Sequence, residues 1–250
     1  MRRAARRPTV LVAAGLEGTG RVGLLADIAA VHAAGGVATA VVTALTAQGR
    51  RFAVGRVEGR LLAAQLDAAL ALGPPSSVKL GMVPDARALA LLWPRLSLLG
   101  VPLVVDPVVR TSHAERLSSL TPSDFRRLGK VPNVWLTPNV PELAWLLGRR
   151  ALPKRPEEVT ALATALLEEG FAAVVVKGGH LLGAATDILV SRAGVVRLSG
   201  RRLPRAARKR GTGCRFASTL ATRLALGQPP LPAVQGAKRA VRRYLREAET

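Results

Sequence analysis

The chain has 250 residues, of which 49% are hydrophobic, so it is long enough for one large core; 37 Lys and Arg against 16 Asp and Glu give a formal net charge of +21. That charge indicates either a compositional bias toward arginine or attraction of a polyanion, but aromatic residues make up only 3% of the chain and no nucleic-acid-binding signature is present, so we expect no specific nucleic-acid partner. The apolar runs fall short of the roughly 20 residues of a membrane-spanning helix, and the single cysteine, Cys214, excludes an intramolecular disulfide and fits a reducing cytoplasm.

Residues 1–8 form a basic stretch that is not followed by a long apolar segment, so we predict a solvated tail rather than a signal peptide. Residues 9–250 contain no internal repeat and no Ser/Gly-rich linker. They are predicted to form a single domain.

Along the chain, short and nearly continuous apolar runs alternate with longer amphipathic stretches rich in Ala and Leu. The predicted strands are 9–13, 37–44, 78–81, 102–106, 134–137 and 172–177; the predicted helices are 23–34, 60–71, 86–99, 123–128, 140–147 and 156–169. Strands buried on both faces and separated by helices are typical of right-handed βαβ units. The pattern predicts an α/β fold, a three-layer αβα sandwich with a mostly parallel, doubly wound sheet.

The last third of the chain changes character. Residues 187–191 and 195–199 are predicted to form a β-hairpin, and a basic segment follows at 201–210. Next come Gly211–Cys214, a helix to about residue 226, a Pro-rich turn at 227–232 and a helix to the end. We expect the basic segment, with Arg201, Arg202, Arg205, Arg208, Lys209 and Arg210, to raise the affinity for a polyphosphate.

Glycines and polar residues follow the predicted parallel strands at the edge where such sheets bind ligands. They are Gly15–Gly20, Gly81 and Met82, Asp106, Thr137–Asn139 and Lys177–His180. Their grouping predicts a binding site on this rim.

The short motif Gly211–Cys214 (GTGC) opens a predicted helix. Its small residues allow close approach of the backbone to an anion, and the free N–H groups with the helix dipole favour negative charge. Phosphoryl transfer needs such donors. The structural alternative is a tight turn before an ordinary helix.

This motif resembles the G-[TA]-G-[CD] anion hole of ribokinase-like kinases, and its cysteine form resembles that of hydroxymethylpyrimidine/phosphomethylpyrimidine kinases. Further motifs match that family in the same order along nearly the whole chain. They are AG at 14–15 with GLLAD at 23–27, VTAL at 42–45 with Gln48, KLGM at 79–82, VDPVV at 105–109, LTPNVPE at 136–142, VKGGH at 176–180 and AK at 237–238.

The resemblance implies an ATP- and Mg²⁺-dependent kinase that phosphorylates hydroxymethylpyrimidine, its monophosphate or both in thiamine diphosphate biosynthesis, with a possible homodimer. The implied roles are a pyrimidine pocket of Gly15, Gln48, Met82 and Val109; nucleotide and phosphate contacts from Lys177, Asp106, Thr212 and Lys238; Mg²⁺ held through water by Glu142 and Asn139; and catalysis by Gly211, Gly213 and Cys214.

These residues also have purely structural interpretations. Asp106 can end a strand in a turn, Glu142 can serve only the helix dipole, Met82 can fill core space and Gln48 can be a surface amide. Cys214 can be a small buried residue. Its position at a helix N-terminus with arginines nearby in sequence instead predicts a lowered thiol pKa and a thiolate that accepts the substrate proton.

The sequence also departs from the family pattern. Glu17–Thr19 stand where the family has Asp-Pro-Ser, Arg21 replaces a glycine, Gly49 replaces an Asn, Lys209 and Arg210 replace Thr-His, and Arg215 replaces Thr or Ser. The added cations can tighten a phosphorylated substrate or block the usual geometry. The altered loops make a catalytically weakened ligand-binding or regulatory protein one alternative function. A pyridoxal-type kinase is the other, since both substrates are flat hydroxymethyl heteroaromatics.

Overall fold

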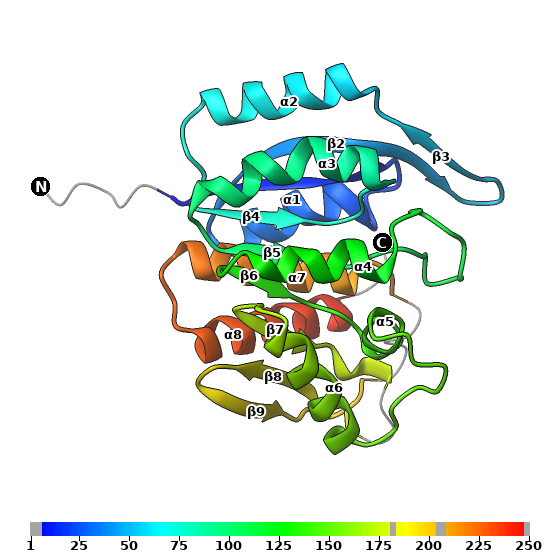
Figure 1. The fold of residues 1–250 in the computed structure, drawn as a ribbon, viewed down its shortest axis with the longest axis vertical. Helices are drawn as coiled ribbons and strands as arrows, with labels where there is room; N and C mark the ends of the chain where they lie inside the picture. Colours follow the sequence, from blue (N-terminus) through cyan, green and yellow to red (C-terminus); the bar gives the residue numbers. More distant parts are fainter. Residues whose placement is uncertain (1–6, 181–183, 204–208, 248–250) are drawn as a thin grey trace, which may run out of the picture.

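The computed structural model describes residues 7–180, 184–203 and 209–247, and its centre is one mixed β-sheet (Figure 1). In the described residues the sheet has nine strands in the order β3-β2-β1-β4-β5-β6-β7-β8-β9. Their bounds are β1 Thr9–Glu17, β2 Val37–Gln48, β3 Phe52–Arg56, β4 Ser77–Leu80, β5 Leu103–Val105, β6 Val134–Leu136, β7 Ala173–Val176, β8 Asp187–Ser191 and β9 Gly194–Leu198. Strands β2, β1, β4, β5, β6 and β7 are parallel, whereas β3, β8 and β9 pair antiparallel at the edges.

Helices cover both faces of the sheet, which confirms the predicted three-layer αβα architecture (Figure 1). One face carries α2 (Gly59–Ala71), α3 (Ala86–Leu96), α4 (Pro122–Arg126), α5 (Val140–Leu146) and α6 (Pro156–Glu168). The other carries α1 (Gly23–Ala33), α7 (Thr212–Ala225) and α8 (Pro230–Arg246).

The two cores follow from the alternation of side chains along each strand. In β1, Leu11 and Ala13 enter the core under α2 to α6, while Val10 and Val12 enter the core under α1, α7 and α8. Because successive side chains point to opposite faces, a central strand must be apolar throughout. This is why the parallel strands were visible in the sequence as continuous apolar runs.

The sequence missed β3 and misplaced some boundaries. Residues of Phe52–Arg56 are exposed or half-buried, so this edge strand lacks an apolar run. The first strand continues to Glu17, past the predicted end at residue 13, with a register shift between Ala14 and Leu16. Helix α8 begins at Pro230, inside the predicted turn, because proline fits the first position of a helix.

Strand β1 lies where the winding of the sheet reverses. Its neighbours are β2 on one side and β4 on the other, and all three are parallel. In open α/β sheets the crevice beyond the carboxyl ends of the strands at such a reversal is the usual ligand site. The carboxyl end of β1 brings Gly15 there, next to Met82 after β4.

A buried ion pair joins three elements beneath this crevice. Lys79 of β4 places its Nζ 2.7 Å from Asp27 Oδ2 of α1, and the other oxygen of Asp27 accepts a 2.8 Å hydrogen bond from Ser218 of α7. The side chains of Lys79 and Asp27 are 1% and 0% exposed. Burial alone would lower the pKa of Lys79, but nearby negative charge, chiefly that of Asp27, outweighs it and raises the pKa.

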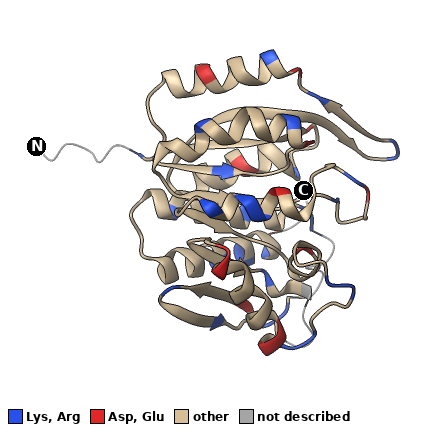
Figure 2. Cartoon of the chain, viewed as in Figure 1, with Lys and Arg blue, Asp and Glu red and all other residues tan. Residues whose placement is uncertain are grey.

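The charged residues are distributed over the molecule rather than gathered on one element. Figure 2 shows Lys and Arg on helices, strands and loops in all parts of the fold. Within the described ranges, no helix combines the length and the apolar character needed to cross a membrane.

We expect the substitution Asp27→Asn to lower the free energy of unfolding by about 3–5 kcal/mol, because it leaves the buried Lys79 charge unpaired. Urea denaturation at pH 7 measures this. The control is Arg197→Ala, which removes an exposed 2.8 Å ion pair with Glu157 and should cost less than about 1 kcal/mol. Equal, small effects of the two substitutions would contradict a structural role for the pair.

Candidate active site

A cavity of about 560 Å³ lies at the carboxyl ends of the parallel strands. Its wall contains all but one of the residues that the sequence nominated: Gly15, Gln48, Met82, Asp106, Asn139, Glu142, Lys177, Gly211, Thr212, Gly213, Cys214 and Lys238. They come from β1, β2, α5, α7, α8 and the loops between the elements, among them the loop that follows β7. Residues separated by more than 200 positions in sequence thus share one space.

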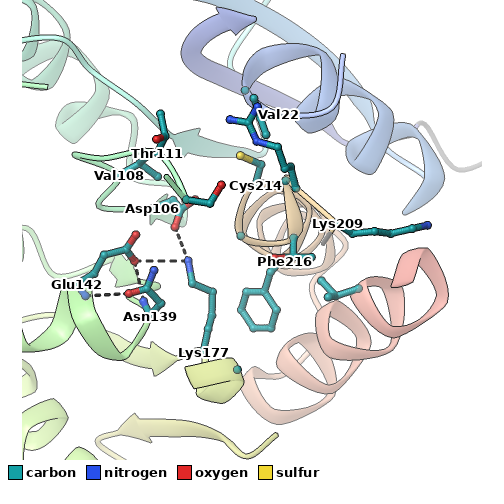
Figure 3. Close-up of a pocket in the computed structure, with 18 of the residues that line it drawn as sticks. Val22, Asp106, Val108, Thr111, Asn139, Glu142, Lys177, Lys209, Cys214 and Phe216 are labelled. Atoms are coloured by element: carbon teal, nitrogen blue, oxygen red, sulfur yellow. Dashed lines mark hydrogen bonds and ion pairs between the residues drawn. The ribbon is translucent and has the colours of Figure 1, made fainter. Parts of the chain in front are cut away.

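Val109 differs from the prediction. It packs against the core beneath α2 to α6, and its carbonyl accepts hydrogen bonds from Leu117 and Ser118. Its neighbour Val108 lines the cavity instead, as Figure 3 shows. Neighbouring residues of an extended chain point in opposite directions, so an error of one position reverses the assignment.

The N-terminus of α7 forms one wall. Gly211 is the N-cap residue with φ of +76°, and a Cβ there would collide with the Arg21 carbonyl, so the position requires glycine. A Cβ on Gly213 would lie 3.2 Å from Lys177 Nζ and 3.6 Å from Asp106 Oδ2. The small residues therefore keep the free N–H groups of the helix open to an anion beside a lysine.

Opposite this helix, Lys177 connects two carboxylates (Figure 3). Its Nζ lies 2.6 Å from Asp106 Oδ1 and 3.8 Å from Glu142 Oε2. Burial would lower the pKa of Lys177, but Asp106 and Glu142 raise it above its usual range, so the ammonium form persists. The other carboxylate oxygen of Asp106 is buried and has no hydrogen-bond partner.

Asn139 and Glu142 form a capping box at the start of α5. The Asn139 side chain accepts a 2.8 Å hydrogen bond from the Glu142 N–H, and the Glu142 carboxylate accepts a 2.7 Å bond from the Asn139 N–H. These two residues therefore cap the N-terminus of α5 and also line the cavity. Burial raises the pKa of Glu142 to about 7, with Lys177 opposing and Asp106 adding to the rise.

The site has the donor set of a hydrated hard cation. The unpartnered Asp106 oxygen and the Glu142 carboxylate belong to the same cluster, but the described residues contain no group of three or more His, Cys, Asp and Glu side chains that could enclose a metal. Mg²⁺ keeps several waters and uses one or two protein carboxylates with substrate phosphates. The residues present therefore fit Mg²⁺.

The expectation of a Cys214 thiolate is wrong. Burial raises the pKa of the Cys214 thiol to about 11, and the carboxylates of Asp27 and Asp106 add to the rise against Lys79 and a Gly23 backbone hydrogen bond. Cys214 lines the cavity, and the arginines near it in sequence donate to other groups, Arg210 to Gln48 and Arg215 to the Arg21 carbonyl. The side chain is therefore protonated at neutral pH.

Those arginines bind the loop before α7 to its surroundings. Arg210 donates to the backbone and side-chain oxygens of Gln48, and Arg215 donates to the Arg21 carbonyl. Tyr244 of α8 holds the opposite side: its hydroxyl donates to the Arg210 carbonyl at 3.0 Å, and its ring lies 3.9 Å from the Arg215 guanidinium carbon. The departures from the family pattern form one connected network.

Sequence reasoning missed Tyr244, and its only signal was that it is the single tyrosine of the chain. The Asp27 and Lys79 pair matched family motifs but received no role. Lys238 lines the cavity, and its Nζ lies 2.9 Å from Asp187 and 2.8 Å from the Ala185 carbonyl; its contact with a phosphate stays a prediction. Arg201, Arg202, Lys209 and Arg210 also line the cavity, whereas Arg205 and Arg208 lie outside the described residues.

Comparison with known proteins gives a consistent result. The family model for phosphomethylpyrimidine kinase matches residues 18–250. The hydroxymethylpyrimidine/phosphomethylpyrimidine kinase of Rhizobium meliloti is 35% identical over 231 residues, which cover 90% of this chain and 85% of that protein.

Two solved structures show the same fold. The phosphomethylpyrimidine kinase of Clostridium difficile 630 superposes with a TM-score of 0.79 at 29% identity and covers 96% of this chain and 100% of its own. The pyridoxal kinase of Staphylococcus aureus in complex with AMP-PCP superposes with a TM-score of 0.85 at 23% identity, covering 98% and 90%. Since the family model matches nearly all residues and the bacterial relative is similar over most of its length, the chain belongs to the phosphomethylpyrimidine kinase family.

Proposed function

We propose that this chain is a kinase that uses ATP and Mg²⁺ to phosphorylate hydroxymethylpyrimidine, its monophosphate or both in thiamine diphosphate biosynthesis. One observation carries the proposal: the open N-terminus of α7, the Lys177 ammonium and the Asn139–Glu142 pair face a single cavity that also contains Met82. Family membership supplies the substrate class. We propose that residues 9–250 act as one domain in the cytoplasm; the homodimer stays a prediction.

At the nucleotide end, the chain offers positive charge and backbone donors. Gly211, Thr212 and Gly213 would present N–H groups to the transferred phosphoryl group, with the Lys177 ammonium beside them. Lys238 lines the cavity on the α8 side. The AMP-PCP complex of the related fold supports a nucleotide in such a cavity. When bound, Mg²⁺ would neutralise charge on the phosphate oxygens. Glu142 and Asn139 would hold it through water, with the free carboxylate oxygen of Asp106 beside them.

At the other end, the crevice beside β1 suits a flat ring. A Cβ on Gly15 would lie 3.1 Å from the Met82 sulfur, so glycine keeps the slot open. The Met82 carbonyl is fixed by a 2.6 Å hydrogen bond from the buried Thr43 hydroxyl. Gln48 and Val108 complete the wall, one with an amide and one with an apolar face. We propose that these residues orient the pyrimidine for in-line attack.

We expect this chain to phosphorylate hydroxymethylpyrimidine, its monophosphate or both with kcat/KM at least about tenfold above that for pyridoxal, since even a small misfit in an apolar pocket discriminates by about 10- to 200-fold. Calorimetry with each compound and a turnover assay with ATP and Mg²⁺ measure this. Faster turnover of pyridoxal would favour the pyridoxal-type alternative. Binding without turnover of any substrate would favour the weakened ligand-binding relative.

We expect Glu142→Gln to raise the Mg²⁺ concentration for half-maximal activity about tenfold or more, because it removes a carboxylate from the proposed metal site. The pKa of about 7 also predicts that the wild-type Mg²⁺ requirement rises as the pH falls from 8 to 6, since protonation removes the same charge. The variant should lose this pH dependence. The control is Glu158→Gln on the exposed start of α6; equal behaviour of both variants would remove Glu142 from the site.

Alkylation of Cys214 by iodoacetamide should be slow at pH 7 and should accelerate about tenfold per pH unit to well above pH 9, because only the thiolate reacts. In the chain unfolded in urea, the alkylation rate should stop rising with pH near the ordinary thiol pKa of about 8.5. We also expect Cys214→Ala to lose less turnover than the roughly 10²-fold or more that a general base contributes. An alkylation rate that is already independent of pH near pH 7 in the folded protein would restore the thiolate hypothesis.

A further inference from the structure

Arg210 is a cation held at the junction of the two ends of the cavity. Its guanidinium donates to the Gln48 carbonyl at 3.4 Å and to the Gln48 side-chain oxygen. Gln48 is the last residue of β2 and lies at the proposed pyrimidine end of the cavity. Gly211, which follows Arg210 in the sequence, is the N-cap of α7 and lies at the proposed phosphate end. A group bound to both ends must pass this guanidinium.

The charge of Arg210 has no carboxylate counterion among the described residues. No ion pair within those residues includes it, and its Nε is buried without a hydrogen-bond partner. The network around it adds the cations of Lys209 and Arg215, which both lie against Tyr244, while Arg21 contributes only its backbone carbonyl. A half-buried guanidinium bonded only to neutral oxygens retains donors for an anion and fits the oxygens of a phosphate in a fork geometry.

The arginine is also positioned in advance. The Tyr244 hydroxyl fixes the Arg210 carbonyl, and Lys209 Nζ donates to the Tyr244 carbonyl at 2.8 Å and to the Glu247 carbonyl. Binding of an anion to a side chain that is already held in place costs less conformational entropy than binding to a side chain that must first be ordered.

We infer that Arg210 receives the phosphate of a phosphorylated pyrimidine, so that the cavity selects the pyrimidine monophosphate over the neutral alcohol. The inference rests on the proposed function and specifies its substrate. The γ-phosphate of ATP has the same chemistry, but in the proposed function that group is bound by the α7 N-terminus and by Lys177, whose Nζ lies 3.2 Å from the position of a Cβ on Gly213.

The reaction of the monophosphate balances without a base. An ionised oxygen of the monoester attacks the γ-phosphorus of ATP, a new P–O bond forms, and the bond from the γ-phosphorus to the bridging oxygen breaks with its electron pair leaving on ADP. The attacking oxygen carries no proton, so none has to be accepted. The alcohol, by contrast, must lose its hydroxyl proton, and the buried Cys214 thiol is already protonated. Arg210 would offset the repulsion between the two phosphate groups.

The test compares wild type with Arg210→Met, Arg210→Lys and Arg51→Met. Methionine removes the charge and keeps an unbranched side chain. Lysine keeps the charge but lacks the planar, forked donors of the guanidinium group. Arg51 is an exposed arginine three positions from Gln48 that does not line the cavity, so its loss controls for net charge. Calorimetry without nucleotide gives Kd for the monophosphate and for the alcohol; steady-state kinetics gives KM and kcat for both and KM for ATP; thermal melting verifies the fold.

We expect Arg210→Met to weaken monophosphate binding roughly 10- to 100-fold, the usual effect of losing charge-assisted hydrogen bonds. Binding of the alcohol and KM for ATP should change less than about threefold, Arg210→Lys should recover part of the loss, and Arg51→Met should resemble wild type. An equal loss for both pyrimidines, an increase in KM for ATP alone, or tighter binding of both would overturn the inference. Failure of the wild type to phosphorylate either pyrimidine would instead overturn the proposed function, since the binding measurement stands apart from turnover.

Discussion

The buried pair of Lys79 and Asp27 is the constraint on which the site depends. Two charges removed from water must be paired and hydrogen-bonded, so β4, α1 and α7 can pack only in the arrangement that brings Lys79, Asp27 and Ser218 together. This arrangement fixes α7 against the sheet, and with it the height at which Gly211–Cys214 meets the ends of β5 and β7. The same pair influences Cys214, since the Asp27 carboxylate raises the pKa of its thiol and the Lys79 ammonium lowers it.

Above this pair, the two sides of the cavity carry different charged groups. Carboxylates of Asp106 and Glu142 gather around Lys177 on the side of α5 and β7, whereas cations without described carboxylate partners gather around Arg210 on the side of β2 and α8. In the proposed function, the carboxylate side would hold the metal of the nucleotide and the basic side would receive the phosphate of the acceptor. The large positive charge of the chain therefore has one local arrangement with chemical meaning, although Figure 2 shows basic residues over the whole fold.

The sequence predicted the central sheet well because residues such as Val10 to Ala13 are buried on both faces, and an apolar run then records the strand directly. It missed β3 because Phe52–Arg56 is an edge strand with little burial. In the site, the motifs predicted most of the residues that line the cavity, but Val108 lines it in place of Val109. The predicted Cys214 thiolate was wrong. Arg210 and Arg215 are close to Cys214 in sequence, but their guanidinium groups donate to Gln48 and Arg21, and burial raises the pKa of the thiol. Tyr244 could not be predicted, since its hydrogen-bond partners Lys209 and Arg210 lie more than 30 positions earlier.

The hold of Tyr244 on the loop before α7 has a consequence for a truncated chain. A chain cut just before Tyr244 keeps the nine described strands, α1, α7 and most of α8. The Arg210 carbonyl would then lack the hydroxyl that donates to it, and Lys209 Nζ would lack both of its carbonyl acceptors. Loss of a few residues would therefore release the loop that carries Arg210 while the sheet and its two cores stay in place.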